Sequence, residues 1–393
     1  MNEKNQKIKK HNFLFSGIAI SCLLLSIGEL FGSPVRVSLF NNSQIRSVVI
    51  SAWNGQLVVS SADSFQYSIA HGKAIHATLC NGRIWLISEN EQIGSFEQIT
   101  VKSSDSLAVV RLRPVSPQIE ARNYEELIIM SVDVDKILII NQIDKELYIA
   151  GVIEAETGQR QTAEFYKAKA IICRTYLYRA INRHQNEGFH LCDEVHCQAY
   201  KGQCQNRSTI FSAVLATDNI IIVDSKESKP ILAVYHSNCG GQTELSQNVW
   251  QSSLPYLVSA TDDYCTFSPN ARWQRTISLN EWNAYLSRNG FRPNPNVDAD
   301  FSFQQTRRTQ NYKVNNFTIP VQKIRADWQL RSTFFSISVV NDNVVLDGRG
   351  YGHGVGLCQE GAMEMGRRGF KYDEIINHYF KNVNLKKAEP LNF

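Results

Sequence analysis

The stretch DKELYIAGVIEAETG, residues 144–158, marks the point where the sequence changes from strand-like runs to helical spacing. Asp144 is a favourable N-cap residue, and the apolar residues after it recur at helical intervals instead of alternating. At 100° per residue three of them share one stripe, which consists of Ile149, Val152 and Ile153. Glu156 falls at the centre of that stripe, and Glu154 points the opposite way. The stretch therefore predicts an amphipathic helix with a carboxylate on its apolar face.

Glu156 allows two interpretations. A carboxylate on an apolar stripe loses hydration, which favours its protonated form and makes it a candidate general acid at neutral pH. If the helix instead ends near Thr157-Gly158, the side chain is exposed at the helix C-terminus and has no such role. The periodicity favours neither interpretation over the other.

The residues before this helix are typical of a β-rich module. Short β-prone runs fill residues 35–140, separated by turn residues such as Asn54-Gly55. A second helix is predicted over roughly residues 162–184 and a closing helix over about 372–380. The sequence thus predicts an α+β protein with a β-rich module, a mixed α+β catalytic domain, and a C-terminal glycine-rich loop and helix. The module covers residues 34–140 and the domain 141–385, with 268–330 as a candidate insertion or subdomain.

The glycine-rich loop GRGYGHGVGLCQEGA spans residues 348–362. Glycine at alternate positions denies a strand its packing side chains, but it lets the backbone come very close to another segment. His353 lies in the middle of this run. Glycine-rich loops are often simple turns, yet the length and mixed composition of this one favour a binding or catalytic loop.

The N-terminal 33 residues resemble an export signal. Four lysines precede residues 13–27, which carry no charge, and small residues follow. We interpret residues 1–33 as a signal peptide or an N-terminal membrane anchor. This implies an exported protein in the periplasm, in the cell wall or at the outer face of the cytoplasmic membrane. The formal net charge of +4 falls to +2 without this segment, because four lysines and two glutamates leave with it. That small excess argues against a nucleic-acid-binding surface.

Cysteine and histidine residues crowd into one part of the chain: His190, Cys192, His196, Cys197 and Cys204, followed by His236 and Cys239. Two cysteines with one or two histidines could hold a tetrahedral zinc ion. In an exported protein, a disulfide among Cys192, Cys197, Cys204 and Cys239 is an equal alternative. Cys239 could also act as a thiol nucleophile with His236, although residues three apart in a strand face opposite sides.

Several ordered motifs across residues 35–385 resemble the SpoIID/LytB family of peptidoglycan-acting proteins. LYIAGVIEAE at 147–156 resembles the family's YLxGVVxxE, and KAKA at 167–170 with RTY at 174–176 resembles its KAQA…RTY. CQAYKG at 197–202 and SNCGG at 237–241 also match. The glycine-rich loop is similar to the family's GxGxGHGVGMSQxGA.

The resemblance implies a lytic transglycosylase in which Glu156 is the general acid/base. Such enzymes cleave the glycan after N-acetylmuramic acid and close a 1,6-anhydro ring. Ordinary glycosidases need two carboxylates, whereas a substrate hydroxyl that acts as nucleophile makes one sufficient. The remaining implied residues contact peptidoglycan glycan strands: Arg174, Tyr200, Ser237, His353 and Gln359.

The resemblance carries two further implications. Some members hold a zinc ion, for which Cys192 and Cys197 with His184 or His190 are the matching residues, although the reaction itself requires no cofactor. Other members are non-catalytic wall-binding proteins that enhance a cell-wall amidase. A zinc or thiol hydrolase is the third alternative.

Four residues depart from the family pattern. Thr157-Gly158 stands where the family usually has Met-Pro, Lys169 replaces a glutamine, and Cys358 replaces a serine in the glycine-rich loop. We expect Lys169 to influence the charge state of a nearby carboxylate. None of these changes removes the candidate acid.

Overall fold

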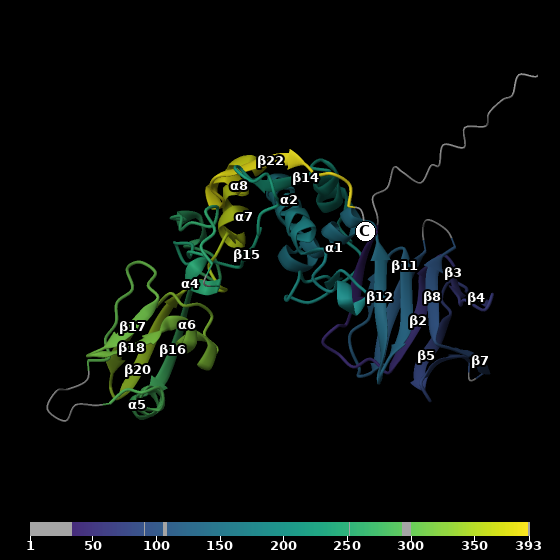
Figure 1. The fold of residues 1–393 in the computed structure, drawn as a ribbon, viewed down its shortest axis with the longest axis horizontal. Helices are drawn as coiled ribbons and strands as arrows, with labels where there is room; N and C mark the ends of the chain where they lie inside the picture. The colour runs from purple at the N-terminus through teal and green to yellow at the C-terminus, as the bar shows by residue number, and fades with distance from the viewer. Residues whose placement is uncertain (1–33, 90, 105–107, 251, 293–299, 392–393) are drawn as a thin grey trace, which may run out of the picture.

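The computed structural model describes residues 34–89, 91–104, 108–250, 252–292 and 300–391. The predicted signal or anchor, residues 1–33, lies outside them. None of the helices in the described ranges combines the length and hydropathy that crossing a membrane requires. The β-rich module, the helices and a smaller β-containing unit follow one another along the longest axis of the molecule (Figure 1).

The module consists of two sheets. Its described strands are β1 Val35–Leu39, β2 Ser47–Asn54, β3 Leu57–Ser60, β4 Gln66–Ile69, β5 Ala74–Cys80, β6 Arg83–Ser88, β7 Glu91–Phe96, β8 Gln98–Ser103, β9 Val109–Ser116, β10 Arg122–Tyr124, β11 Leu127–Asp133 and β12 Lys136–Ile143. One sheet has the order β13-β1-β12-β11-β8-β3-β4, in which β13 (Leu191–Cys192) is added from later in the chain, and the other has the order β10-β9-β2-β5-β6-β7. Along β5 buried residues alternate with more exposed ones, as expected of a strand with one face on a core.

Helices and short strands follow the module. They are α1 Lys145–Thr157, α2 Ala163–Ala180, η2 Gln185–Glu187, β13 Leu191–Cys192, η3 Arg207–Phe211, α3 Ser212–Leu215, β14 Ile220–Asp224, β15 Tyr235–His236, α4 Gln247–Trp250, η4 Asp263–Cys265, β21 Leu357–Cys358, α7 Gln359–Arg367, α8 Tyr372–Tyr379 and β22 Val383–Lys387. The predicted N-cap of α1 is confirmed, because Asp144 Oδ1 accepts hydrogen bonds from the amides of Glu146 (2.8 Å) and Leu147 (3.2 Å). The α+β class predicted from the sequence is confirmed as well.

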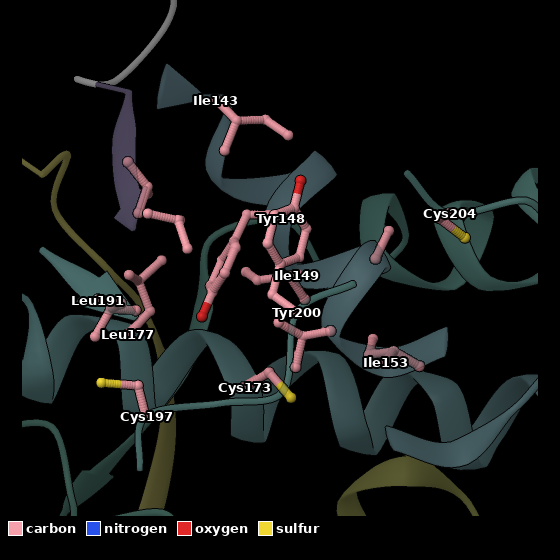
Figure 2. Packing of buried hydrophobic residues seen from close by; sticks show 14 of the residues in the cluster. Ile143, Tyr148, Ile149, Ile153, Cys173, Leu177, Leu191, Cys197, Tyr200 and Cys204 are labelled. Atoms are coloured by element: carbon pink, nitrogen blue, oxygen red, sulfur yellow. The ribbon is translucent and has the colours of Figure 1, made fainter. Parts of the chain in front are cut away.

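One hydrophobic core joins the module to the helices. It runs from the strands into the buried faces of α1 and α2, and Figure 2 shows Tyr148, Ile149, Ile153, Cys173 and Leu177 packed within it. β13 adds a further link, since it pairs in parallel with β1, with Leu191 opposite Val37. Segments that carry candidate site residues are therefore held against the sheet.

A second hydrophobic cluster lies farther along the chain. It is built from β16 Arg272–Ser278, α5 Leu279–Arg288, β17 Asn311–Val314, β18 Phe317–Pro320, α6 Val321–Asp327, β19 Phe335–Val340 and β20 Asn343–Arg349. Its three-stranded sheet has the order β16-β20-β19, and Trp282 is fully buried in its core. The elements of this cluster stand at the opposite end of the molecule from the β-rich module (Figure 1). β20 leads directly into the glycine-rich loop.

Candidate active site

A groove with a volume of about 810 Å³ brings together residues that are far apart in the sequence. Its lining includes Glu156 from α1, Ser237 after β15, and His353 and Gln359 from the glycine-rich loop. Cys197 and His196 line it as well. Among the described lining residues, Glu156 is the only one with a carboxylate.

Glu156 occupies the last turn of α1, which ends at Thr157 as one of the two interpretations expected. The side chain is nevertheless half-buried rather than exposed. Its Oε1 accepts hydrogen bonds from the Ala199 amide (3.0 Å) and the Tyr235 hydroxyl (3.3 Å). Neither bond uses Oε2. The carboxylate is therefore held in place by one oxygen while the side chain borders the groove.

Glu154 lies outside this groove, as the helical spacing predicted. Its two oxygens accept hydrogen bonds from the amides of Gln205 (2.7 Å) and Asn206 (3.0 Å). The two glutamates therefore have different surroundings although only one residue separates them. Glu154 consequently serves as a matched control for Glu156.

Lys169 lies behind Glu156 with no exposed surface. Its Nζ is 2.8 Å from the ring centroid of Tyr235 and has no hydrogen-bond partner among the described residues. Burial lowers the pKa of Lys169, while the nearby Cys173 and Glu156 oppose that shift. The residue that departs from the family pattern thus contacts the ring whose hydroxyl donates to Glu156.

The glycine-rich loop packs closely against the segment that follows β15. β15 pairs with β21 in parallel, and a side chain at Gly352 (φ +113°) would come within 2.8 Å of His236 Cβ. A side chain at Gly350 would come within 2.6 Å of the Asn238 carbonyl oxygen. The close approach predicted for the loop is thus made to protein backbone, and it fixes one wall of the groove.

His353 is held as a neutral imidazole. Its Nε2 lies 3.0 Å from the Tyr235 carbonyl oxygen, and its Nδ1 accepts a hydrogen bond from the Val355 amide (3.1 Å). These partners assign the proton to Nε2. Burial lowers the pKa of His353 to about 4. Both nitrogens contact backbone, so the ring positions the groove wall and packs on Trp250, with ring centroids 5.2 Å apart.

Two polar atoms in the groove wall have no hydrogen-bond partner among the described residues. They are Gln359 Oε1, an acceptor, and His236 Nε2, in side chains that are 7% and 4% exposed. Buried polar atoms normally find partners, so their location in the lining indicates a place where a polar ligand can bind. Two exposed aromatic side chains, Trp250 and Tyr351, border the same groove.

Two residues expected to bind substrate are instead buried away from the groove. Arg174 is fully buried and forms a bidentate ion pair with Glu146, with distances of 3.0 Å from Nε to Oε1 and 2.5 Å from Nη2 to Oε2. Tyr200 is also fully buried and donates to Asn141 Oδ1 at 2.9 Å. Neither side chain offers surface to a ligand, so the expectation of direct contact is corrected to a structural role.

A group of four potential metal ligands adjoins the groove. The ligand atoms of His184, Cys192, His196 and Cys197 lie within 4.8 Å of one another. His184 Nε2 is 3.4 Å from Cys197 Sγ, and His184 Nδ1 is 2.5 Å from the Glu187 carboxylate. Hydrogen bonding with Cys192 lowers the pKa of Cys197 to about 6. Two thiols, two imidazoles and a carboxylate behind one imidazole form a donor set that fits zinc.

The structure distinguishes the two histidines considered for this group. His190 Nδ1 accepts a hydrogen bond from the Arg36 amide at 3.1 Å, so it faces β1 instead of the cysteines. His184 lies in the group, together with His196, which belongs to the cysteine–histidine cluster in the sequence but not to the ligand set that the family resemblance implied. Its position directly before Cys197 was the signal available in the sequence.

Cys204 and Cys239, which the sequence grouped with Cys192 and Cys197, lie outside the four-ligand group. All eight described cysteines are unpaired in this structure. Cys204 does not belong to the four-ligand group. Cys239 directs its thiol to Asp262, with 3.2 Å between Sγ and Oδ2. Cys239 is fully buried and is not among the lining residues of the groove. A thiol nucleophile paired with His236 is therefore not formed.

Comparisons with known proteins identify relatives. The SpoIID family model, described as Stage II sporulation protein, matches residues 133–223, which include α1 and the four-ligand group. An uncharacterized protein of Brachyspira hyodysenteriae is 28% identical over 66% of this chain and 71% of its own length. Stage II sporulation protein D of Bacillus amyloliquefaciens is 29% identical over 64% of this chain and 76% of its own. The amidase enhancer of Bacillus subtilis is 26% identical over 60% of this chain and 40% of its own. The motif order, the family model over residues 133–223 and these relatives agree in supporting the SpoIID/LytB family for this chain.

Proposed function

We propose that this protein is an exported lytic transglycosylase that cleaves peptidoglycan glycan strands after N-acetylmuramic acid. The observation that supports this most is the single carboxylate, Glu156, among the described residues that line the groove. A hydrolase that inverts or retains configuration needs a second carboxylate across the scissile bond. A reaction in which the substrate supplies its own nucleophile needs only one.

Glu156 would act twice in this reaction. First it donates a proton to the glycosidic oxygen as the bond to C1 of the muramic acid breaks. Then its carboxylate removes the proton of the C6 hydroxyl of the same sugar, whose oxygen attacks C1 and closes the 1,6-anhydro ring. No water is consumed, and Glu156 ends in its starting protonation state. The bonds from the Ala199 amide and the Tyr235 hydroxyl would hold Oε1 during both steps.

The groove offers contacts suited to a glycan. Trp250 is 41% exposed and Tyr351 46%, so each presents an apolar ring against which a sugar can pack. Gln359 Oε1 can accept a hydrogen bond from a hydroxyl or an acetamido N–H. Arg183 and Arg325 line the same groove and would attract the carboxylates of the stem peptides.

A zinc ion fits the four-ligand group as a structural element. His184, Cys192, His196 and Cys197 would hold it, and such a closed site supplies folding stability rather than a reactive water. Ala199, whose amide donates to Glu156, follows Cys197 by two residues. The four residues would therefore steady the segment that positions the acid, while the proton transfers remain with Glu156.

Location and partners follow from the same proposal. The export signal predicted in residues 1–33 and the proposed substrate both support a location in the periplasm, in the cell wall or at the outer face of the cytoplasmic membrane. Peptidoglycan glycan strands are its proposed partners.

A second candidate function has its own support. The similarity to the Bacillus subtilis amidase enhancer favours a non-catalytic protein that binds the wall and stimulates a cell-wall amidase. The groove would then bind glycan without cleaving it. In that case Glu156 has no chemical role.

Analysis of the reaction products distinguishes the transglycosylase from the amidase enhancer. Purified protein is incubated with intact peptidoglycan and with glycan strands freed of stem peptides, and the products are identified by mass. We expect 1,6-anhydro products from the wild type, a loss of at least about 100-fold for Glu156→Gln, and little change for Glu154→Gln. Equal product yield from Glu156→Gln would rule out its role as the acid. Absence of products from the wild type, with stimulation of an added amidase that Glu156→Gln retains, would favour the enhancer.

A further inference from the structure

A second group of potential ligands lies beneath the glycine-rich loop, in four buried side chains from three segments. Cys239 follows β15, and Cys358 is the last residue of β21. Asp262 directly precedes η4, and Cys265 is the last residue of η4. Each of the four side chains has 0% exposure. Their ligand atoms lie within 4.8 Å of one another. The group shares no residue with the four ligands near the groove.

The distances within this group suit one small cation. Cys239 Sγ lies 3.4 Å from Cys265 Sγ and 3.2 Å from Asp262 Oδ2. In a tetrahedral zinc site with bonds of about 2.3 Å to sulfur, neighbouring sulfur atoms lie about 3.7 Å apart. The observed separations are close to that value without any change of backbone.

Two backbone amides donate to the sulfur atom of Cys358. Cys358 is the N-cap of α7, where its sulfur accepts hydrogen bonds from the Gly361 amide (3.4 Å) and the Cys239 amide (3.3 Å). Helix N-termini and backbone amides stabilise the thiolate form that metals bind.

No salt bridge to Asp262 is found among the residues that the structure describes, although its carboxyl group is fully buried. Its described partners are the Tyr379 hydroxyl (3.0 Å), the Tyr264 amide (3.1 Å) and the Cys239 thiol. The neighbouring Arg308 guanidinium donates to the Cys239 carbonyl oxygen and faces the Glu244 carboxylate instead. Buried carboxylates and thiolates are stable when they are paired or coordinate a metal. A divalent cation would supply the missing charge.

A disulfide accounts for less of this arrangement. Cys239 and Cys265 could form one, but it would leave the Cys358 thiol and the Asp262 carboxylate outside the bond, each with only neutral hydrogen-bond donors as partners. A metal ion uses all four donors at once. Three sulfur ligands select a soft or borderline ion such as zinc over calcium or magnesium.

We propose that these four side chains bind one structural zinc ion, distinct from any ion near the groove. Binding would displace the thiol protons and tie the glycine-rich loop to η4 and to the segment after β15. Cys358 directly precedes Gln359, and Cys239 lies two residues after Ser237, so the ion would fix both groove-lining residues. Cys358 stands where the family pattern has serine, so the third thiol is a feature of this chain.

The test measures zinc bound per chain in the full-length protein, purified with reductant and without chelator. We expect Cys358→Ser to bind one zinc ion fewer than the wild type, and Cys80→Ser, which changes an exposed cysteine, to bind the same number. A Cys192→Ser/Cys197→Ser variant should keep one ion. Unchanged zinc content in Cys358→Ser, or none in the Cys192→Ser/Cys197→Ser variant while it remains folded by circular dichroism, would overturn the proposal.

Cobalt substitution in the wild type gives a readout that does not depend on variants. Replacing zinc with Co²⁺ should produce sulfur-to-metal charge-transfer absorption, with an intensity that corresponds to five thiolates when both groups are loaded. Peptide mapping of zinc-loaded protein handled without reductant is the complementary measurement. A Cys239–Cys265 disulfide in that map, or absorption that accounts for only two thiolates, would contradict the site.

Discussion

Replacing Arg174 with methionine should destabilise the protein without altering how it recognises glycan. The guanidinium is fully buried, while Glu146 is 5% exposed and its carboxylate receives hydrogen bonds from Arg174 Nε and Nη2. Arg174 also donates to the carbonyl oxygens of Ile220 (3.0 Å) and Val214 (3.2 Å). The substitution would leave the buried Glu146 carboxylate with Lys145 Nζ, 3.4 Å from Oε1, as its described cationic partner, and it would remove one donor from each of the two carbonyl groups.

The expected loss follows from that geometry. Removing one member of a buried ion pair typically costs about 3–5 kcal/mol when the remaining charge is uncompensated. Because Lys145 still contacts Glu146, we expect a loss at the lower end of that range. The two lost carbonyl contacts lie in the same network and do not add independently. Replacing both partners with apolar residues of similar size, as in Arg174→Met with Glu146→Leu, should recover much of the loss because no charge stays buried.

Urea unfolding of the wild type, both single variants and the double variant measures these free energies, and binding to denuded glycan strands is measured under native conditions. We expect each single variant to unfold at a lower urea concentration than the wild type. The midpoint of the double variant should lie between those of the single variants and that of the wild type. Wild-type stability in Arg174→Met, combined with weakened glycan binding, would refute the structural role and restore the contact expected from the sequence.

Two further predictions concern the glycine-rich loop. Burial lowers the pKa of His353 from 6.5 to about 4. As the pH falls, the unfolded chain therefore takes up a proton at this residue before the folded chain does. The stability of the folded state is full above pH 6.5 and decreases as the pH falls toward 4. His353→Gln should therefore flatten the pH dependence of the urea midpoint in that window; an unchanged slope would contradict the neutral, buried imidazole. Gly352→Ala should lower glycan cleavage or binding, because its Cβ would meet His236 Cβ at 2.8 Å. Gly369→Ala is the control, since Gly369 also has positive φ (+92°) but nothing lies within 4 Å of its Cβ position. Equal effects of the two alanines in a binding and cleavage assay would show that backbone strain, and not the close approach, matters.

Features set by neighbouring residues were predictable from the sequence. The N-cap at Asp144 and the apolar stripe predicted α1, because both depend on interactions within a few residues. The opposite directions of Glu154 and Glu156 follow from helical periodicity in the same way. The close approach of the glycine-rich loop was also evident, since glycine at alternate positions suits little else.

Features that depend on residues far apart in the chain could not be predicted from the sequence. Arg174 lies in a motif that resembles the family's, but its role depends on Glu146, 28 residues away, and on carbonyl groups beyond residue 210. Sequence spacing could not separate His184 from His190, because the pairing of β13 with β1 turns His190 toward Arg36. Cys239 and Cys358, 119 positions apart, meet only through the parallel pair β15–β21.

The sequence by itself determined the α+β class, the helix that carries Glu156 and the resemblance to the SpoIID/LytB family. Only the tertiary structure decided which charged and thiol side chains are buried, which of them meet, and which face the groove. The physical reason is that capping and periodicity act over a few residues, whereas the burial and pairing of a side chain depend on segments that the fold brings together from anywhere along the chain.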